Sequence, residues 1–241
     1  MISINLLLIS LLLGNLIKKK ANTNHDRYLY YIDTQFNLDH SLVQLVEKIL
    51  PLCQHHDEIT IFTLEYSAFE KGLIFQALCD ALLTIKRDFV TAVNVLDNEF
   101  ESENLSLQRL WHEIQKPLKI FESLVKLIND IKQNRHKSPL SVLYQSLITS
   151  TDSEIHGLFF FLFQKSIFPF LEMLGKWIYY GLIDDQFGEF MIEEKQYNGG
   201  IGGGVAGDVG GMENFDWDDR FHFRTNKVSL GPFLVFFGVI E

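Results

Sequence analysis

Carboxylates gather in the stretch FLEMLGKWIYYGLIDDQFGEFMIEE, which spans residues 170–194. Asp184, Asp185 and Glu189 follow the end of a predicted helix, and paired carboxylates can act as acid and base when they are buried against one another. The alternative is a turn whose side chains accept hydrogen bonds from their own backbone. We favour the turn, because aspartate together with a nearby glycine, here Gly188, is typical of turns.

A histidine pair offers a possible metal site. His55 and His56 stand directly before Asp57 and Glu58. Adjacent histidines cannot readily place both rings on one ion, and the sequence shows no distant set of ligands to complete a site. We therefore predict a solvated loop here and no bound metal.

The two cysteines, Cys53 and Cys79, fall on separate predicted helices and lack the CxxC spacing of a zinc site. Free cysteine commonly serves as a small core hydrophobe, and cytosolic thiols stay reduced. We predict reduced, buried thiols, with a disulfide between the two as the alternative.

A glycine-rich segment, residues 199–211, contains the pattern G-x-G-x-x-G at Gly202, Gly204 and Gly207. A dinucleotide site needs a strand before this pattern and a helix after it, and the flanking residues offer neither. The segment is instead typical of a flexible linker. The chain also lacks H-E-x-x-H, G-x-S-x-G, phosphate-binding-loop and protein-kinase motifs, so we predict no catalytic residue and no cofactor.

Charge and composition narrow the possible partners. Acidic residues outnumber basic ones by 31 to 21, which gives a formal net charge of −10. Nucleic-acid binding requires concentrated basic surface, so we exclude that class of partner and expect a basic partner surface instead. The 21 phenylalanines require an interior or an interface that buries a large aromatic area. At 241 residues, the chain fits one large domain or two small ones.

Apolar residues recur at the three-and-four spacing of amphipathic helices along most of the chain. The predicted helices span residues 41–51, 67–96, 105–131, 140–148, 152–164 and 170–180, with a strand at 28–32 and an ambiguous segment at 59–64. We expect Pro51 to end the first helix, Gly72 to lie inside the second and Pro117 to kink or restart the third. Short connections imply antiparallel neighbours, so the predicted fold class is an all-α bundle.

The last of these helices carries apolar residues that share one face, namely Phe170, Leu171, Leu174, Trp177 and Ile178. Gly181 supplies a left-handed cap at its end. Beyond the turn, Phe190 and Ile192 alternate and are expected to point back toward the core. We expect Trp177 and Tyr179 to be core or interface anchors rather than ligand-binding residues.

Together these blocks resemble a known family. The motif W-I-Y-x-G-x-I-x-D, the short turn and E-F-M-x-E-E are similar to the first conserved domain of the gamma-tubulin complex components, nearest to the second-component type. Residues 42–51, 67–81 and 105–117 are similar to successive helices of that domain, and DWDDRF at 216–221 is similar to a later segment. The sequence departs from the family at the glycine-rich segment, where the family has a charged helical stretch.

The resemblance implies a non-enzymatic scaffold that makes lateral contacts with neighbouring components in microtubule nucleation. It implies a place in the cytoplasm and cytoskeleton, at the centrosome or spindle pole. Gamma-tubulin would be bound indirectly, because the family's second domain, which is associated with that binding, is not found in this sequence. The family-motif residues, structural or at an interface, are Trp177, Ile178, Tyr179, Gly181, Asp184, Glu189, Phe190, Glu193, Trp217 and Arg220.

The expected domain boundaries are 1–27 for an apolar leader or extra helix, 28–197 for the helical bundle, 198–214 for the glycine-rich linker and 215–241 for a further, truncated helical segment. The leader lacks a basic start and a cleavage site and is shorter than the ~20 residues of a membrane span. The alternative to the scaffold is a membrane-tethered or secreted helical protein led by this segment. The abrupt C-terminus suggests a fragment, a truncated paralogue or an incomplete gene model.

Overall fold

A computed structural model describes residues 17–21, 28–32, 40–102, 106–194 and 221–224. Within these ranges the chain forms six α-helices, namely α2 (His40–Tyr66), α3 (Leu73–Glu101), α4 (Leu107–Gln133), α5 (Pro139–Thr149), α6 (Ser153–Ser166) and α7 (Phe168–Tyr180). Helices account for most of the described residues, so the all-α prediction is confirmed.

Two small antiparallel sheets accompany the helices: β1 (Ile17–Ala21) with β2 (Tyr28–Ile32), and β3 (Ile192–Glu194) with β4 (Phe221–Phe223). The predicted strand at residues 28–32 is confirmed as β2. Its partner β1 contains the lysine run that follows the apolar leader, and the sequence analysis did not predict it. The segment 215–241 was expected to be helical, but its residues 221–223 form β4. The other residues of the predicted leader, the glycine-rich segment and residues 225–241 lie outside the described residues.

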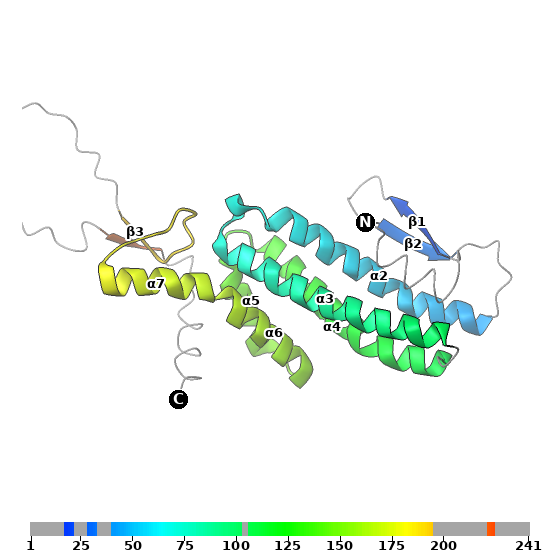
Figure 1. The fold of residues 1–241 in the computed structure, drawn as a ribbon. Coiled ribbons are helices and arrows are strands. Elements are labelled where there is room, and N and C mark those ends of the chain that lie inside the picture. Colours follow the sequence, from blue (N-terminus) through cyan, green and yellow to red (C-terminus); the bar gives the residue numbers. More distant parts are fainter. Residues whose placement is uncertain (1–16, 22–27, 33–39, 103–105, 195–220, 225–241) are drawn as a thin grey trace, which may run out of the picture.

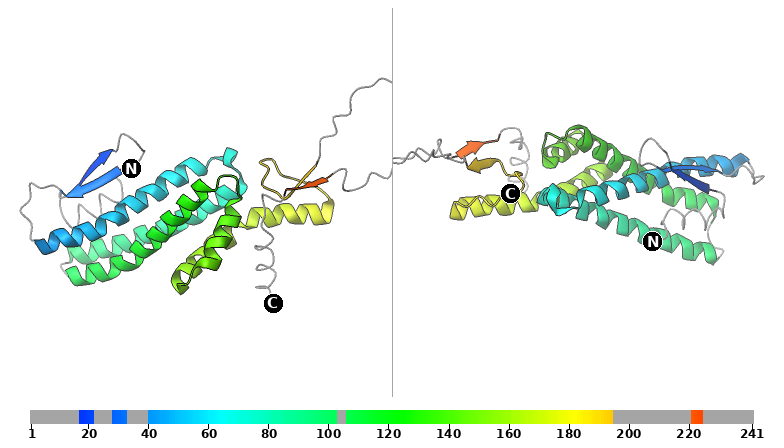
Figure 2. Two further views of the ribbon diagram at one scale, coloured as in Figure 1. Left: turned by 180° about the vertical axis from the view of Figure 1, so that it is seen from behind. Right: turned by 90° about the horizontal axis from the view of Figure 1, so that it is seen from above.

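The three long helices form an elongated bundle in which α2 packs on both α3 and α4 (Figure 1). Helices α5 and α6 pack on each other and on this bundle near one end, and α7 extends beyond them. The β1–β2 sheet lies against α2 at the opposite end from α7, as both views in Figure 2 also show. The molecule therefore has a rod-like body with α7 projecting from one end.

The predicted end of the first helix at Pro51 is wrong, because α2 continues through this proline to Tyr66. Proline removes one backbone donor, at a cost of about 3 kcal/mol inside a helix. Ile49, Leu52 and Ile59 are buried on either side of it, and each buried aliphatic side chain contributes roughly 1.5–3 kcal/mol. Tertiary packing thus outweighs the local preference, and the ambiguous segment 59–64 is helical.

The prediction that Gly72 lies inside the second helix is also wrong. A short 3₁₀ helix, η2 (Phe69–Lys71), precedes Gly72, and α3 begins only at Leu73. Gly72 has a φ of 111°, which residues with a side chain rarely adopt. By contrast, α4 continues through Pro117 as one helix.

The predicted helix starts after residue 137 are confirmed. Ser138 precedes α5 with Pro139 at its first turn, although the Ser138 side chain makes no capping hydrogen bond. Asp152 is the N-cap of α6, and its side chain accepts a hydrogen bond from the backbone N–H of Glu154 at 3.0 Å. Pro169 lies in the first turn of α7, which is separate from α6 as the predicted helix ranges implied.

One apolar cluster runs through all the helices and continues into β3. Its largest fully buried side chains are aromatic, namely Phe62, Phe121, Phe170 and Phe190. The apolar stretch of α6 contributes Phe159 and Phe163 to this core. Much of the phenylalanine excess therefore fills the interior.

The predicted solvated loop around the histidine pair is wrong, because His55 and His56 lie within α2. His56 is only 5% exposed, and its ring lies near those of Phe89 and Phe121, with centroids 6.2 and 6.1 Å away. The run of four polar residues at positions 55–58 suggested a loop. His56 and Asp57, however, are buried on the inner side of α2. Among the described residues, no three His, Cys, Asp or Glu side chains gather closely enough to hold a metal ion.

Cys53 and Cys79 are buried and free, so the prediction of reduced thiols holds and the disulfide alternative does not. Burial raises the pKa of each thiol to about 12.

In the part of the chain that the structure describes, no single helix has both the length and the apolar run of a membrane span. Helices α6 and α7 meet that test only when joined across their 41° bend, by length and composition alone.

Candidate functional site

The candidate site is the stretch in which most of the family-motif residues lie, and it folds as α7, a turn and β3. Phe170 and Met173 are the buried residues of α7, and Trp177 is partly buried beside them. Phe190 returns from the turn to pack on this face, with its ring centroid 5.6 Å from Phe170 and 6.3 Å from Trp177. It is 1% exposed, and Ile192 is 3% exposed, so the predicted inward return of the chain is confirmed.

The prediction that Ile178 shares the buried face of α7 is wrong, since its side chain is 61% exposed. Tyr179 is 82% exposed, so the core alternative is wrong for this residue, and the interface alternative stays a prediction. The physical reason is that the last turn of α7 extends past the bundle. Helical spacing places side chains on one face of a helix, but it does not say where the neighbouring helices stop.

Gly181 ends α7 as predicted. Its φ of 65° and ψ of 18° place it in the left-handed region, and its N–H donates to the Trp177 carbonyl at 2.9 Å. A residue with a Cβ is strained in this conformation, so glycine suits the position. The cap turns the chain sharply, which lets the following residues fold back beside the helix.

Each of the three carboxylates in the turn has a different partner. Asp185 accepts hydrogen bonds from the backbone N–H groups of Glu189 and Phe190, at 2.8 and 3.0 Å. Asp184 forms an ion pair with Lys176 at 2.7 Å. The turn interpretation is therefore the correct one, and the carboxylates are not arranged as an acid–base pair.

Glu189 caps a helix that begins 116 residues earlier in the chain. Its Oε2 accepts a hydrogen bond from the N–H of Leu73 at 2.7 Å, and both carboxylate oxygens lie 3.2 Å from the N of Ile74. These are the first N–H groups of α3, which have no partner within the helix. The negative charge also interacts favourably with the helix dipole, an effect of about 0.3–2 kcal/mol.

Gly72 makes room for this contact. A Cβ at Gly72 would lie 2.3 Å from Oε1 of Glu189, which is too close for any real pair of atoms. The sequence gives one hint of the arrangement: Lys71 and Gly72 precede α3, so no Ser, Thr, Asp or Asn is available as a local cap. The missing local cap is supplied instead by Glu189.

Arg224, just after β4, braces the turn from the other side, and sequence reasoning missed it. Its backbone N–H donates to the Met191 carbonyl at 2.7 Å, and its Nε donates to Glu193 at 2.6 Å. Its guanidinium also lies 3.6 Å from the Asp185 carboxylate. The hydrogen bond from Arg224 holds the pKa of Glu193 below its usual value.

Gly188 has a second close approach of this kind. A Cβ at Gly188 would lie 2.9 Å from a guanidinium nitrogen of Arg224, and Gly188 itself has a φ of 66°.

The structure brings together the motif residues Trp177, Gly181, Asp184, Glu189, Phe190 and Glu193. Trp217 and Arg220 lie outside the described residues.

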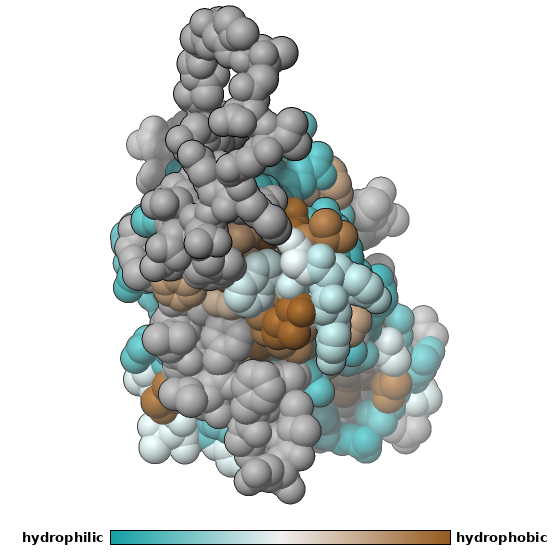
Figure 3. Space-filling model, turned by 90° about the vertical axis from the view of Figure 1, so that its left-hand side faces the viewer, coloured by the Kyte–Doolittle hydropathy of each residue, from teal (hydrophilic) through white to brown (hydrophobic). Residues whose placement is uncertain are grey.

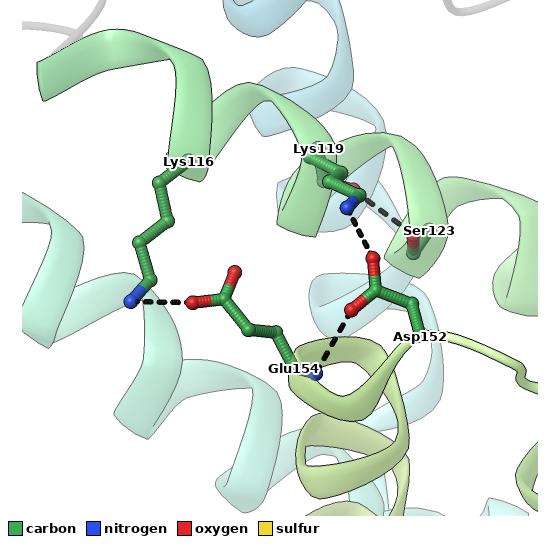
Figure 4. A network of polar contacts seen from close by, with 5 residues as sticks. All are labelled: Lys116, Lys119, Ser123, Asp152 and Glu154. Carbon is green, nitrogen blue, oxygen red and sulfur yellow. Dashed lines mark hydrogen bonds and ion pairs between the residues drawn. The ribbon is translucent and has the colours of Figure 1, made fainter. Parts of the chain in front are cut away.

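A separate polar network joins α4 to the start of α6 (Figure 4). Lys119 pairs with Asp152, and Lys116 pairs with Glu154 at 2.9 Å. Ser123 donates a hydrogen bond to the Lys119 carbonyl at 2.9 Å. Pairing with Asp152 raises the pKa of Lys119 and lowers that of Asp152. These groups are solvent-exposed, so the network fixes the approach of the two helices more than it stabilises the fold.

The arrangement around Glu189 is a mechanical junction rather than a reactive centre. Glu189 ties the turn to α3, Asp185 shapes the turn, and Arg224 clamps the turn to β4. These carboxylates contact backbone N–H groups or cations. Such charge-assisted hydrogen bonds hold chain segments together.

The chain is similar to known proteins over most of its length. A family model described as gamma tubulin complex component N-terminal matches residues 5–230. Gamma-tubulin complex component 2 of Mus musculus is 34% identical over 163 residues, which are 66% of this chain and 18% of the relative. Gamma-tubulin complex component 2 of Arabidopsis thaliana is 28% identical over 181 residues, covering 74% of this chain and 26% of the relative.

A fungal protein shows the same similarity. Spindle pole body component alp4 of Schizosaccharomyces pombe is 24% identical over 209 residues, covering 68% of this chain and 26% of the relative. The chain therefore spans between 18% and 26% of the length of these three relatives.

Proposed function

Because the chain belongs to the gamma-tubulin complex component family, through the N-terminal region of that family, we propose that it is a non-enzymatic scaffold of the gamma-tubulin complex. In this role it makes lateral contacts between components during microtubule nucleation at microtubule-organising centres. The expected location is the cytoplasm and cytoskeleton, at the centrosome or spindle pole.

The observation that carries this proposal is the family match over residues 5–230. The fold supports it physically. A lateral scaffold must keep its shape while neighbours bind its sides, and α2, α3 and α4 form an elongated bundle around a continuous apolar core. The interlocked turn around Glu189 adds rigidity where α7 meets this bundle.

The proposed partners are other gamma-tubulin complex components, bound through helical side faces. Gamma-tubulin is expected to associate indirectly, through those components. The names of the relatives, which include a component of the gamma-tubulin complex and a component of the spindle pole body, support this set of partners.

Co-purification tests the proposal. The full chain, carrying an affinity tag, is expressed with sibling components and gamma-tubulin, and the captured material is separated by size. We expect sibling components to be captured with the chain, and gamma-tubulin to be captured only when the siblings are present. Failure to capture any sibling, under conditions in which full-length relatives assemble, would contradict the scaffold role. Capture of gamma-tubulin without siblings would contradict indirect binding.

A further inference from the structure

The end of α7 carries a concentrated set of exposed apolar and aromatic side chains. Ile178 and Tyr179 are 61% and 82% exposed, and Tyr180 and Leu182 are 75% and 62% exposed. Figure 3 looks onto the end of the molecule from which α7 projects, and apolar side chains reach the surface there among polar ones. We call Ile178, Tyr179, Tyr180 and Leu182 the α7 patch.

The local geometry explains why these side chains face solvent. The other face of α7 is covered by the core and by Phe190, and Gly181 then turns the chain away from the helix axis. A Cβ at Gly181 would meet no atom within 4 Å beyond its chain neighbours. The backbone at the centre of the α7 patch is therefore open to a partner.

The charges around the α7 patch are unbalanced. Residues 168–194 and 221–224 contain six carboxylates and two cations. Both cations are already paired within this unit, Lys176 with Asp184 and Arg224 with Glu193. The adjoining η2 contributes one residue of each sign and does not change the balance. The described part of this unit therefore has a formal net charge of −4, six negative charges against two positive ones, which favours a basic partner.

From this geometry we propose that the α7 patch is a docking surface for a basic amphipathic helix of a partner protein. The patch spans five positions, from the last three residues of α7 to Leu182 just beyond the Gly181 cap. An α-helix, about 10–12 Å across with its side chains, matches a surface of this size. Tyrosine is enriched among residues that anchor interfaces, and an amphipathic helix supplies an apolar face with flanking cations. The inference rests on the proposed scaffold function, since it names one kind of partner for a protein that works by binding.

A binding assay with the purified full chain tests this inference. The probe is a fluorescein-labelled 18-residue helix of leucine and lysine, and the comparison probe has the same leucine face with glutamate in place of lysine. We expect the lysine peptide to bind at micromolar concentration and the glutamate peptide to bind at least tenfold more weakly. The double variant I178S/Y179S should weaken binding of the lysine peptide at least tenfold, as measured by fluorescence anisotropy.

The matched control is the double variant L64S/I148S, which removes two other exposed apolar side chains, 74% and 60% exposed, from α2 and α5. It should leave the affinity within twofold. Equal binding of both peptides, or equal loss in both double variants, would overturn the proposal. So would a tenfold gain in affinity in F233S/F236S, because the chain's own C-terminal segment would then be the occupant.

A concentration-dependent dimer that I178S/Y179S abolishes would also overturn the proposal, since a second copy would then cover the α7 patch. The oligomeric state is measured by light scattering during size-exclusion chromatography. The peptide assay contains no sibling component, so it can succeed when the co-purification fails, and the reverse. Failure of the docking inference is thereby distinguished from failure of the scaffold proposal.

Discussion

The long-helix bundle and the α7 turn are held together by different kinds of contact. In the bundle, α2, α3 and α4 bury aliphatic and aromatic side chains over many turns. In the α7 turn, a few polar contacts act between segments far apart in the chain: Glu189 on α3, Asp185 on the turn backbone and Arg224 on Glu193. The stability of the bundle therefore comes from buried apolar area, whereas the α7 turn depends on a few polar contacts, each of which contributes less.

The first and largest expected effect concerns the bundle. Phe121 is 1% exposed and its ring centroid lies 4.8 Å from that of Phe89. Replacing it, Phe121→Ala, should lower the free energy of unfolding by about 3–5 kcal/mol, because it removes a large buried side chain and leaves a cavity. Denaturant unfolding followed by circular dichroism measures this. A loss below about 1 kcal/mol would contradict the claim that buried apolar side chains contribute most of the stability of the bundle.

The second effect concerns the junction itself. Gly72→Ala should lower the free energy of unfolding by about 1–3 kcal/mol, because alanine is strained at a φ of 111° and its Cβ meets Glu189. Gly157→Ala is the matched control, since Gly157 lies within α6 and a Cβ there meets no atom within 4 Å. The control should be neutral or slightly stabilising, as alanine is the better helix former. Equal losses in the two variants would contradict the role of Gly72.

A third, smaller effect isolates the cap. Glu189→Ala should lower the free energy of unfolding by about 1–2 kcal/mol and leave the first N–H groups of α3 without their acceptor. Hydrogen–deuterium exchange of the Leu73 and Ile74 amides should become faster, while exchange in α4 stays the same. Glu172→Ala is the control, because Glu172 is an exposed residue of α7 that pairs with Lys176 at 3.6 Å and lies away from the start of α3 in the sequence. Unchanged exchange at Leu73 and Ile74 would refute the cap.

The smallest effect is a pH dependence at the edge of the turn. The hydrogen bond from Arg224 lowers the pKa of Glu193 from its ordinary value of 4.5. The folded-state pKa is below the unfolded one, so this contact stabilises the fold above pH 4.5 and is lost as the pH falls through the folded value. Carboxyl NMR titration should place the Glu193 midpoint below 4.5, and Arg224→Gln should move it back up. An unchanged midpoint in the variant would show that Arg224 is not the cause.

Sequence patterns predicted the parts of the fold that depend on neighbouring residues. Gly181 followed an amphipathic run and is the left-handed cap, and the helices predicted over 140–148 and 152–164 begin within one residue of those positions. The alternation of Phe190 and Ile192 correctly predicted their return to the core. In each case a few consecutive residues contain the whole cause of the local structure.

The errors arose where a distant contact decides the structure. Pro51 does not end α2, because side chains on both sides of it are buried against other helices. Ile178 is exposed because the bundle stops before the last turn of α7. Glu189 and Arg224 act on residues 116 and 31 positions away, and no local pattern predicts such partners.

The span between Glu189 and α3 has a consequence for how the protein is made. A chain emerges from the ribosome at roughly 5–20 residues per second, so α3 waits about 6–23 s for the residue that completes its first turn. Until residue 189 has been synthesised, the first N–H groups of α3 lack the carboxylate that accepts their hydrogen bonds in the folded protein. The order of synthesis thus makes the α7 turn the last step in sealing a helix that was translated long before.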